Sequence, residues 1–428
     1  MKDDGRNDLA ALLSEPVLDE TPKSGLWSLA ATLLIVGAIV GGYFVFRDGN
    51  PPATADSTDT SVPSGSATVV SSPVATEATA GSESTVESVL NQYPSQVISA
   101  RMALDPDSGT VVMFGGKEGP RGQGLDDTWL YDVTKDQWHL LDATTVPPRR
   151  LGHAMTYVDS LGEVVVVGVG ADPVSACSLR SLVRDTTVDV WSLNVASGSW
   201  TWLTQSFTPD DRWGHAIAYD SESDRLMLFG GVGAFVSRDR AELLSDTWVY
   251  DVSSNTWEPV ETDLTPDKRA CHQMVYDPST GLVYLWGGQT EDSAGDGTMW
   301  TFDLSEHLWS EVDTSGAAAP EPRWSHQMVF EPNSGMIFMI GGTWFQTTAT
   351  DTGTVTALGP TDEVWAFDPS TARWQQRAPA PGPLWAPSAA PTGDGRILIF
   401  SAGATAVYDP ASDSWEDLTP TASSDPTP

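Results

Sequence analysis

The sequence predicts an all-β fold made of six repeated units, and the spacing of its tryptophans carries this prediction. One tryptophan recurs in every unit, at intervals that range from 41 residues (Trp374 to Trp415) to 65 residues (Trp309 to Trp374). The six positions are Trp138, Trp200, Trp257, Trp309, Trp374 and Trp415. A second tryptophan stands nine residues before each of the first five, while Ala406 takes that place in the sixth unit: Trp129, Trp191, Trp248, Trp300 and Trp365. A unit that recurs in this way indicates a repeat architecture.

Each unit contains enough short apolar segments for four strands. Upstream of every tryptophan pair lies an apolar run that ends on small residues, such as Leu226–Gly231 in the third unit. The segments of that unit are bounded by Gly, Asn, Asp and Ser, which is typical of strands joined by tight turns. The four expected strands are His215–Tyr219, Arg225–Gly230, Thr247–Asp251 and Thr256–Val260.

The order of apolar run, Gly-Gly, variable stretch, Trp, short turn and Trp resembles the kelch repeat, as in the central domain of galactose oxidase. The resemblance covers roughly residues 99–418. It implies a six-bladed β-propeller with one four-stranded blade per repeat. Because each blade is complete, from the first strand at Arg101 to the fourth at Trp415, we expect the ring to close without exchange of a strand. The segment 86–98 can still add at the seam.

The repeated residues themselves predict how the blades pack. We expect the tryptophans to lie between blades, where a large aromatic side chain buries much apolar area, rather than to bind sugar. The paired glycines are expected to relieve crowding where the second strand ends.

An apolar segment near the N-terminus predicts a membrane anchor. Residues 26–46 contain no charged residue and are long enough to cross a bilayer as a helix. Lys2, Arg6 and Lys23 precede this span and only Arg47 closely follows it, which predicts a short acidic cytoplasmic tail (1–25) and a propeller outside the cytoplasm. A cleaved signal peptide is the alternative, but the apolar run is too long and is followed by no Ala-x-Ala site.

Residues 47–98 are expected to form a disordered linker rich in Ser, Thr, Pro and Ala, either a glycosylated stalk or a plain spacer. Residues 419–428 are expected to be a disordered tail. The chain carries a net charge of −36, with an isoelectric point near 4.1. This charge argues against a nucleic-acid partner, because phosphate binding needs a basic surface.

The stretch between Gly-Gly and the first tryptophan varies most among the units, as in 171–190 and 343–361. In an up-and-down blade this stretch emerges on the same face as the blade-to-blade connections. Variable loops on a rigid scaffold are where binding usually occurs. We therefore expect function on that face.

An Arg-x-x-His pattern stands at the beginning of four units, where it is expected on the same face as the variable stretches. The first unit has the arginine but not the histidine. The resemblance implies a ligand-binding channel mouth lined by Arg101, Arg150, Arg212, Arg269 and Arg323. Guanidinium groups there would favour carboxylate or phosphate groups. The alternative is that each arginine pairs with an acid of the neighbouring blade and closes the propeller.

The histidines of the pattern are interpreted as structural hydrogen-bonding groups, so we expect no metal site, and the sequence indicates no cofactor. They are His153, His215, His272 and His326. The two cysteines, Cys177 and Cys271, both fall on the variable face. A disulfide between them is permitted outside the cytoplasm but requires the 171–190 loop to lean over the third blade.

Three classes of function fit these features. The first is a membrane-anchored binding or adhesion module for a protein or a glycan. The second is a carbohydrate-active enzyme, an oxidase or a sugar epimerase, which the resemblance allows although no copper-ligand set is recognisable. The third is a purely structural envelope protein. The sequence favours binding over catalysis and assigns no catalytic residue.

Overall fold

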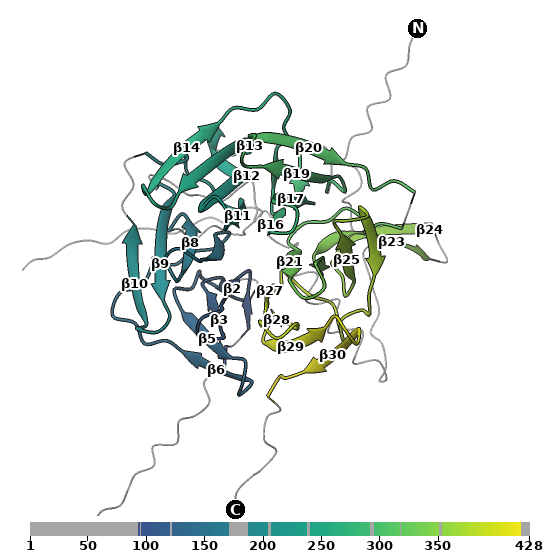
Figure 1. The fold of residues 1–428 in the computed structure, drawn as a ribbon. Helices are drawn as coiled ribbons and strands as arrows, with labels where there is room; N and C mark the ends of the chain where they lie inside the picture. The colour runs from purple at the N-terminus through teal and green to yellow at the C-terminus, as the bar shows by residue number, and fades with distance from the viewer. Residues whose placement is uncertain are drawn as a thin grey trace, which may run out of the picture. The chain divides into compact units, whose positions relative to one another are not determined.

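The protein folds as a ring of six four-stranded antiparallel sheets around a central axis (Figure 1). The computed structural model describes residues 93–94, 96–119, 122–170, 187–203, 207–237, 240–291, 295–316, 318–350 and 353–420. The predicted tail, membrane helix and most of the linker lie outside this range. The described residues contain no helix long and apolar enough to cross a membrane.

The six blades follow the order of the six repeats. Blades 1 to 3 consist of β2 (Arg101–Asp105), β3 (Thr110–Phe114), β5 (Thr128–Asp132) and β6 (Gln137–Leu140); β7 (Ala154–Val158), β8 (Glu163–Gly168), β9 (Asp189–Asn194) and β10 (Ser199–Leu203); and β11 (Ala216–Asp220), β12 (Arg225–Ser237), β13 (Arg240–Asp251) and β14 (Thr256–Val260). Blades 4 to 6 consist of β16 (Gln273–Asp277), β17 (Leu282–Trp286), β19 (Met299–Asp303) and β20 (Leu308–Val312); β21 (Gln327–Glu331), β22 (Met336–Ile340), β25 (Val364–Asp368) and β26 (Arg373–Gln376); and β27 (Ser388–Pro391), β28 (Ile397–Ser401), β29 (Ala404–Asp409) and β30 (Ser414–Asp417). The prediction of six complete blades is confirmed.

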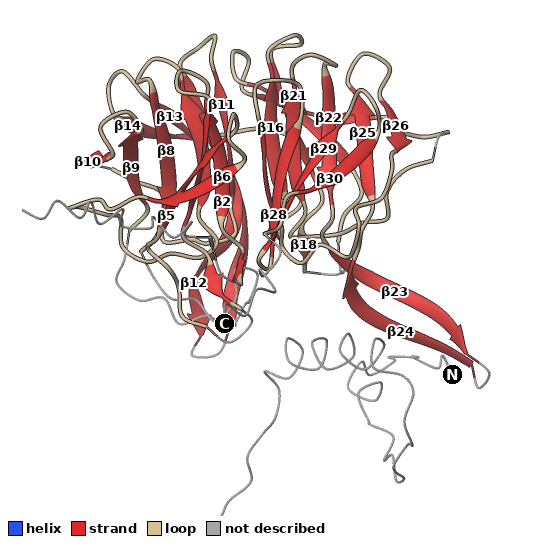
Figure 2. Cartoon of the chain, turned by 90° about the horizontal axis from the view of Figure 1, so that it is seen from below, coloured by secondary structure: helices blue, strands red, loops and turns tan. Residues whose placement is uncertain are grey.

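Short two-stranded pairs add to this ring on one side. They are β1 (Val97–Ile98) with β4 (Lys117–Glu118), β15 (Arg269–Ala270) with β18 (Gln289–Thr290), and β23 (Thr343–Thr350) with β24 (Gly353–Pro360). They lie on the side where second strands lead to third strands, which we call the loop face. The opposite side holds the turns between strands one and two and between strands three and four, and we call it the turn face (Figure 2).

The innermost strand of each blade is its first strand, and these six strands form the wall of the axis. Each lies beside the first strands of both neighbouring blades, and β2 lies beside β27, so the ring is closed. The second strands are the most buried, since Val111–Phe114 and Leu226–Phe229 are at most 1% exposed. They therefore form the core on which the outer strands pack.

The seam between blades 6 and 1 closes without strand exchange, as predicted. Trp138 of blade 1 donates from Nε1 to Thr405 Oγ1 of blade 6 at 3.0 Å, and Ser388 Oγ donates to Ala100 O at 2.8 Å. The segment before the first blade also contributes, because the Tyr93 hydroxyl lies 2.6 Å from Thr405 Oγ1. Tyr93 and β1 thus belong to the folded unit, although their residues fall in the range 47–98 that was expected to be a linker.

The fourth-strand tryptophans pack between blades. Trp200 lies 5.1 Å from Phe114 and Trp309 lies 5.0 Å from Phe229, in each case a ring of the preceding blade. Their indole nitrogens donate to the hydroxyl of a threonine in the third strand of that blade, Thr128 or Thr247. The structural interpretation of these tryptophans is confirmed.

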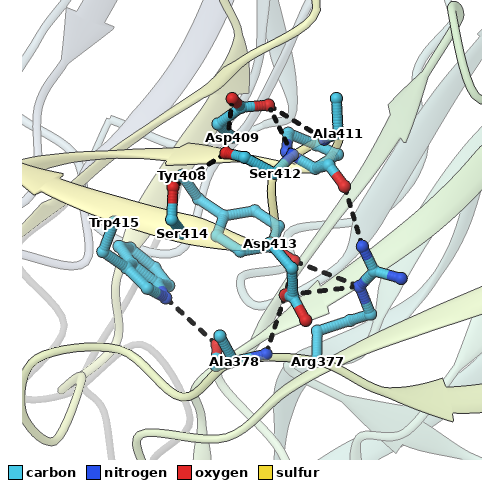
Figure 3. Close-up of polar contacts among 10 residues, drawn as sticks. Arg377, Ala378, Tyr408, Asp409, Ala411, Ser412, Asp413, Ser414 and Trp415 are labelled. Atoms are coloured by element: carbon cyan, nitrogen blue, oxygen red, sulfur yellow. Dashed lines mark hydrogen bonds and ion pairs between the residues drawn. The ribbon is translucent and has the colours of Figure 1, made fainter.

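The last junction departs from this pattern and is strengthened by a cation (Figure 3). Trp415 donates from Nε1 to Ala378 O at 3.0 Å. Arg377, at the end of blade 5, donates to the Tyr408 hydroxyl and to Pro410 O of blade 6, at 3.2 and 2.7 Å. The Tyr408 hydroxyl in turn donates to Asp413 Oδ1 at 2.5 Å. This polar network holds the blade in which Ala406 replaces the first tryptophan.

The paired glycines allow the next blade to approach. Gly287 ends the second strand of blade 4 with φ +73°, and a Cβ there would lie 2.6 Å from His326 Cε1 and 2.7 Å from Arg323 O of blade 5. Gly115 and Gly230 meet the equivalent groups of blades 2 and 4. The expected relief of crowding is confirmed. The first glycine of these pairs is crowded by the Arg-x-x-His segment of the following blade, whereas the second, as in Gly231 and Gly288, is crowded by the segment of its own blade.

We predict that Gly287→Ala destabilises the protein far more than Gly281→Ala. Both glycines have positive φ, but a Cβ at Gly281 meets no atom within 4 Å. Gly281→Ala should cost about 1 kcal/mol of backbone strain, while Gly287→Ala should cost about 2 kcal/mol more because of overpacking. Urea unfolding of the two full-length variants measures this difference. Equal losses would mean that the interblade approach is not tight.

Candidate functional site

Four of the five predicted arginines lie at equivalent places, at the loop-face end of blades 2 to 5. Arg150, Arg269 and Arg323 have no exposed surface, and Arg212 is 1% exposed. Arginine is rarely buried in this way unless it is paired. Each of these side chains therefore needs a carboxylate close by.

The carboxylate comes from the same blade, two to four residues before the first tryptophan of the unit. The ion-pair distances from guanidinium nitrogen to carboxylate oxygen are 2.6 Å for Arg150–Asp189, Arg212–Asp246 and Arg269–Asp296, and 2.5 Å for Arg323–Glu363. The alternative of an acid from the neighbouring blade is wrong for these four. The acid reaches the arginine of its own blade because it lies just before the part of the third strand that pairs with the fourth, at the loop-face end of the blade.

Further contacts satisfy the rest of each guanidinium. In Arg269, Nε donates to Asp267 O at 2.9 Å and Nη1 donates to Gly287 O at 3.0 Å. The backbone links the blades, since Gly288 N donates to Arg323 O at 3.0 Å. The four arginines thus hold the loop-face ends of the strands together. Whether they also touch a ligand stays a prediction.

Arg101 is placed differently from the other four. Arg269 pairs with Thr290 in the β15–β18 ladder, and Val97 pairs with Glu118 in the corresponding β1–β4 ladder. Val97 is therefore the structural equivalent of Arg269, and Arg101 stands four residues later as the first residue of β2. The prediction that Arg101 stands at the same position as the other four arginines was wrong, because blade 1 lacks the Arg-x-x-His pattern.

Blade 1 keeps the carboxylate but lacks the arginine. Asp127 precedes Trp129 by two residues, as Asp246 precedes Trp248 in blade 3. Burial raises the pKa of Asp127, the charge of Asp126 raises it further, and Arg149 partly offsets this. By contrast, the hydrogen bonds and charge of Arg212 outweigh the burial of Asp246 and leave its pKa lowered.

The four histidines pack against the preceding blade. They are at most 1% exposed, and His326 meets the Trp286 ring edge-on at 5.1 Å. Burial lowers the pKa of His215 and His326 to about 3, with nearby arginines adding to the effect. His215 Nε2 lies 3.3 Å from Val167 O. Among the described residues, no group of three or more His, Cys, Asp or Glu side chains could hold a metal ion.

A belt of backbone hydrogen bonds closes the axis at the loop face. Gly214 N donates to Gly152 O at 2.7 Å, Cys271 N to Gly214 O at 2.7 Å, and Ser325 N to Cys271 O at 3.0 Å. These residues occupy one equivalent position per blade, and all have positive φ. The side chains of Leu151, Cys271 and Trp324 pack together beside the belt, with Leu358 against them. We call these four residues the loop-face plug.

The disulfide between Cys177 and Cys271 stays a prediction. Cys271 is 2% exposed and lies in the belt on the loop face. Cys177 and most of the 171–190 loop lie outside the described residues.

Two of the variable segments are β-structured rather than irregular. In blade 3, β12 and β13 continue past the sheet as a hairpin with register shifts at Phe229/Gly231 and beyond. In blade 5 the segment 343–361 contains the β23–β24 ribbon, paired from Thr343↔Pro360 to Thr350↔Gly353, which projects from the loop face (Figure 2). The expectation of a loop there was wrong, because threonine-rich and β-branched residues on both sides of the turn favour paired strands. At the ribbon base, Arg323 lies 5.5 Å from the ring centroid of Trp344.

The comparison with known families agrees with the blade architecture. The KLHDC2/KLHL20/DRC7 Kelch-repeats domain model matches residues 233–428, and the Attractin/LZTR1 beta-propeller model matches residues 82–294. The repeats are kelch repeats. The two models together match both halves of the propeller.

Relatives among characterised proteins share this region. The chain is 26% identical to Adagio protein 3 of Arabidopsis thaliana over 307 residues, which are 68% of this chain and 45% of that protein. It is 28% identical to Adagio-like protein 1 of Oryza sativa subsp. japonica over 250 residues (54% and 36%), and 30% identical to Mei4-dependent protein 6 of Schizosaccharomyces pombe over 142 residues (31% and 19%). The chain therefore spans less than half the length of each of these relatives.

We predict that Asp246→Asn destabilises the protein at pH 7, whereas Asp127→Asn does not. The first change leaves Arg212 buried without its carboxylate, at a cost of about 2 kcal/mol after allowance for the partial exposure of the pair. The stability contributed by the lowered pKa of Asp246 is present above the unfolded pKa of about 3.9 and is lost as the pH falls below it. The effect of Asp246→Asn should therefore shrink in acid.

Asp127 is the matched control, since the raised pKa of its carboxyl means that ionisation destabilises the folded state. Asp127→Asn should be neutral or slightly stabilising at pH 7, and that gain should vanish as the pH falls. Urea unfolding from pH 7 to pH 3 gives both profiles. A large loss for Asp127→Asn would show that its carboxylate has a stabilising partner.

Proposed function

We propose that this kelch propeller is a protein-interaction module that contacts its partner through the loop face. The observation that carries the proposal is the gathering of the β12–β13 hairpin and the β23–β24 ribbon on that face, while the turn face carries short turns of similar length (Figure 2). A ribbon that projects from a rigid ring supplies contact surface at little cost in ordering.

The burial of the four arginines bears on the chemistry of that partner. Their side chains are at most 1% exposed, whereas those of Asp189, Asp246, Asp296 and Glu363 are 20%, 40%, 22% and 25% exposed. At these places a partner meets carboxylates rather than guanidiniums. A partner with basic groups therefore fits this face better than the acidic ligand expected from the sequence, and we propose that the arginines act by holding the carboxylates in place.

The proposal includes the membrane anchor. Residues 26–46, the Lys/Arg distribution around them and the Ser/Thr-rich stretch that follows support attachment by one span, with the propeller outside the cytoplasm. A glycan in place of a protein is the second ligand class that the sequence allows. No feature of the described residues favours a carbohydrate-active enzyme, so we advance binding alone.

We predict that photocrosslinkers on the loop face capture a protein and that those on the turn face do not. The probe positions are Arg149 and Lys268, whose side chains are 51% and 43% exposed, and neither belongs to the buried set. Leu161 and Leu308, at 38% and 52% exposure, are the matched turn-face controls. The full chain, carrying a benzophenone amino acid at one position at a time, is irradiated in its own cells. Equal adducts from both faces, or none from either, would refute the protein-binding loop face.

We predict that proteinase K added to intact cells releases the propeller and leaves a membrane-bound fragment. Residues 48–100 contain no Lys or Arg, so trypsin should not cut in this stretch and serves as the control. Survival of the full-length chain in intact cells, together with cleavage after lysis, would place the propeller on the other side of the membrane.

A further inference from the structure

The propeller axis contains a cavity of about 390 Å³. Residues from the first strands of all six blades line it, among them Met102, Met155, Ile217, Met328 and Ala389. This volume lies within the usual range for small-molecule sites. The cavity is distinct from the loop-face surface on which the proposed function rests.

The cavity opens toward the turn face. Its lining includes Pro106, Asp159 and Pro332, which are exposed residues of the turns after the first strands. At the other end lie Arg101 and His215, just inside the hydrogen-bonded belt. None of the plug residues Leu151, Cys271, Trp324 and Leu358 lines the cavity. A ligand would therefore enter from the turn face, opposite the face on which the sequence predicts function.

Arg101 forms the positively charged floor of this cavity. Its Nη1 donates to Ala100 O at 3.2 Å, and within the described part of the chain no carboxylate oxygen lies within 4.0 Å of its guanidinium. Its charge contributes to lowering the pKa of His153, His215 and His326, which belong to three different blades, so the guanidinium lies near the axis. Burial lowers the pKa of Arg101 to about 10, which leaves it charged at neutral pH.

A half-buried cation without a counter-charge is costly, and a bound anion would remove much of that cost. The other four arginines of the sequence pattern have carboxylates from their own blades, as described above. Arg101 alone among the five faces an accessible cavity. Two amide side chains at the equivalent strand position, Gln273 and Gln327, also line the cavity and can donate hydrogen bonds beside the guanidinium.

The remaining walls limit what kind of anion fits. One residue further along the first strands, Met102, Met155, Ile217, Met274 and Met328 form an apolar collar. Toward the mouth, Tyr157, Tyr219, Tyr276 and Phe330 share an equivalent position. The rim is acidic, because Tyr157 donates to Asp107 and Tyr219 to Asp224, each at 2.9 Å. Burial and then the charges of Asp107 and Asp224 raise the pKa of Asp159. Such a rim repels polyanions, and the collar favours an apolar body.

We propose that the axial cavity is a ligand site, entered from the turn face, for a monocarboxylate whose carboxylate pairs with Arg101 and whose apolar body lies against the methionine collar. The carboxylate can belong to a free organic acid or to the C-terminus of a peptide. Bidentate pairing of guanidinium with carboxylate supplies the directional contact.

Isothermal titration calorimetry of the full chain with hexanoate, hexanamide and adipate tests this proposal. Hexanoate should bind, hexanamide should bind about tenfold more weakly or worse because it lacks the charge, and adipate should be disfavoured by the acidic rim. A tetrapeptide ending in methionine, as free acid and as C-terminal amide, distinguishes the two sources: preference for the free-acid peptide over hexanoate indicates a protein C-terminus, and the reverse indicates a metabolite. Binding by neither acid, or equal binding of acid and amide forms, overturns the proposal.

Arg101→Met should abolish hexanoate binding, and Arg101→Lys should weaken it about tenfold because the bidentate contact is lost. Arg225→Met is the matched control, since Arg225 follows a turn-face turn, its side chain is 41% exposed and it pairs with Asp251. Retained binding in Arg101→Met refutes the site. If Arg101→Met does not fold, the acid and amide comparison on the unmodified chain still decides the question. Loss of this binding would leave the loop-face crosslinking result unaffected, so the two proposals fail separately.

Discussion

The close approach of the Arg-x-x-His segments of blades 2, 4 and 5 to the Gly-Gly of the preceding blade is the contact on which the rest of this structure depends. A side chain on the first glycine would meet the backbone oxygen of the next blade's arginine at 3.0 Å or less in blades 1, 3 and 4. Because glycine leaves that space empty, the arginine and histidine can turn inward and be enclosed at the junction. The interblade tryptophans complete the same junctions further from the axis, and together they convert six separate sheets into one ring.

Enclosing the arginines has an electrostatic consequence. Each buried guanidinium binds the carboxylate at the far end of the variable segment. Arg212, Arg269 and Arg323 also donate to the carbonyl of the glycine at which that segment begins. The ion pair therefore anchors both ends of a loop whose length differs from blade to blade. This explains how the loop face can vary while the ring beneath it stays regular. It also explains why the face presents acids outward in a chain whose net charge is −36.

The belt and the plug divide the axis from the loop face. Because they lie at the loop-face end, the axial cavity communicates with the turn face, and the two faces can serve different ligands. Arg101 marks this division most clearly. It lies in the first strand rather than in the Arg-x-x-His pattern. Its guanidinium faces a cavity lined by all six blades, whereas each of the other four arginines faces a carboxylate.

The sequence alone determined the repeat count, the four strands of each blade, the interblade tryptophans and the need for glycine, because these follow from local spacing that recurs in every unit. It also located the buried arginines, but their partners depended on which third strand lies beside which second strand. The β23–β24 ribbon was missed because a threonine-rich insert forms strands only when its two halves pair. The register of Arg101 and the open end of the cavity were decided by the tertiary structure alone. Only ring closure brings residues of six blades to one axis, and no spacing along the chain records which side chains meet there.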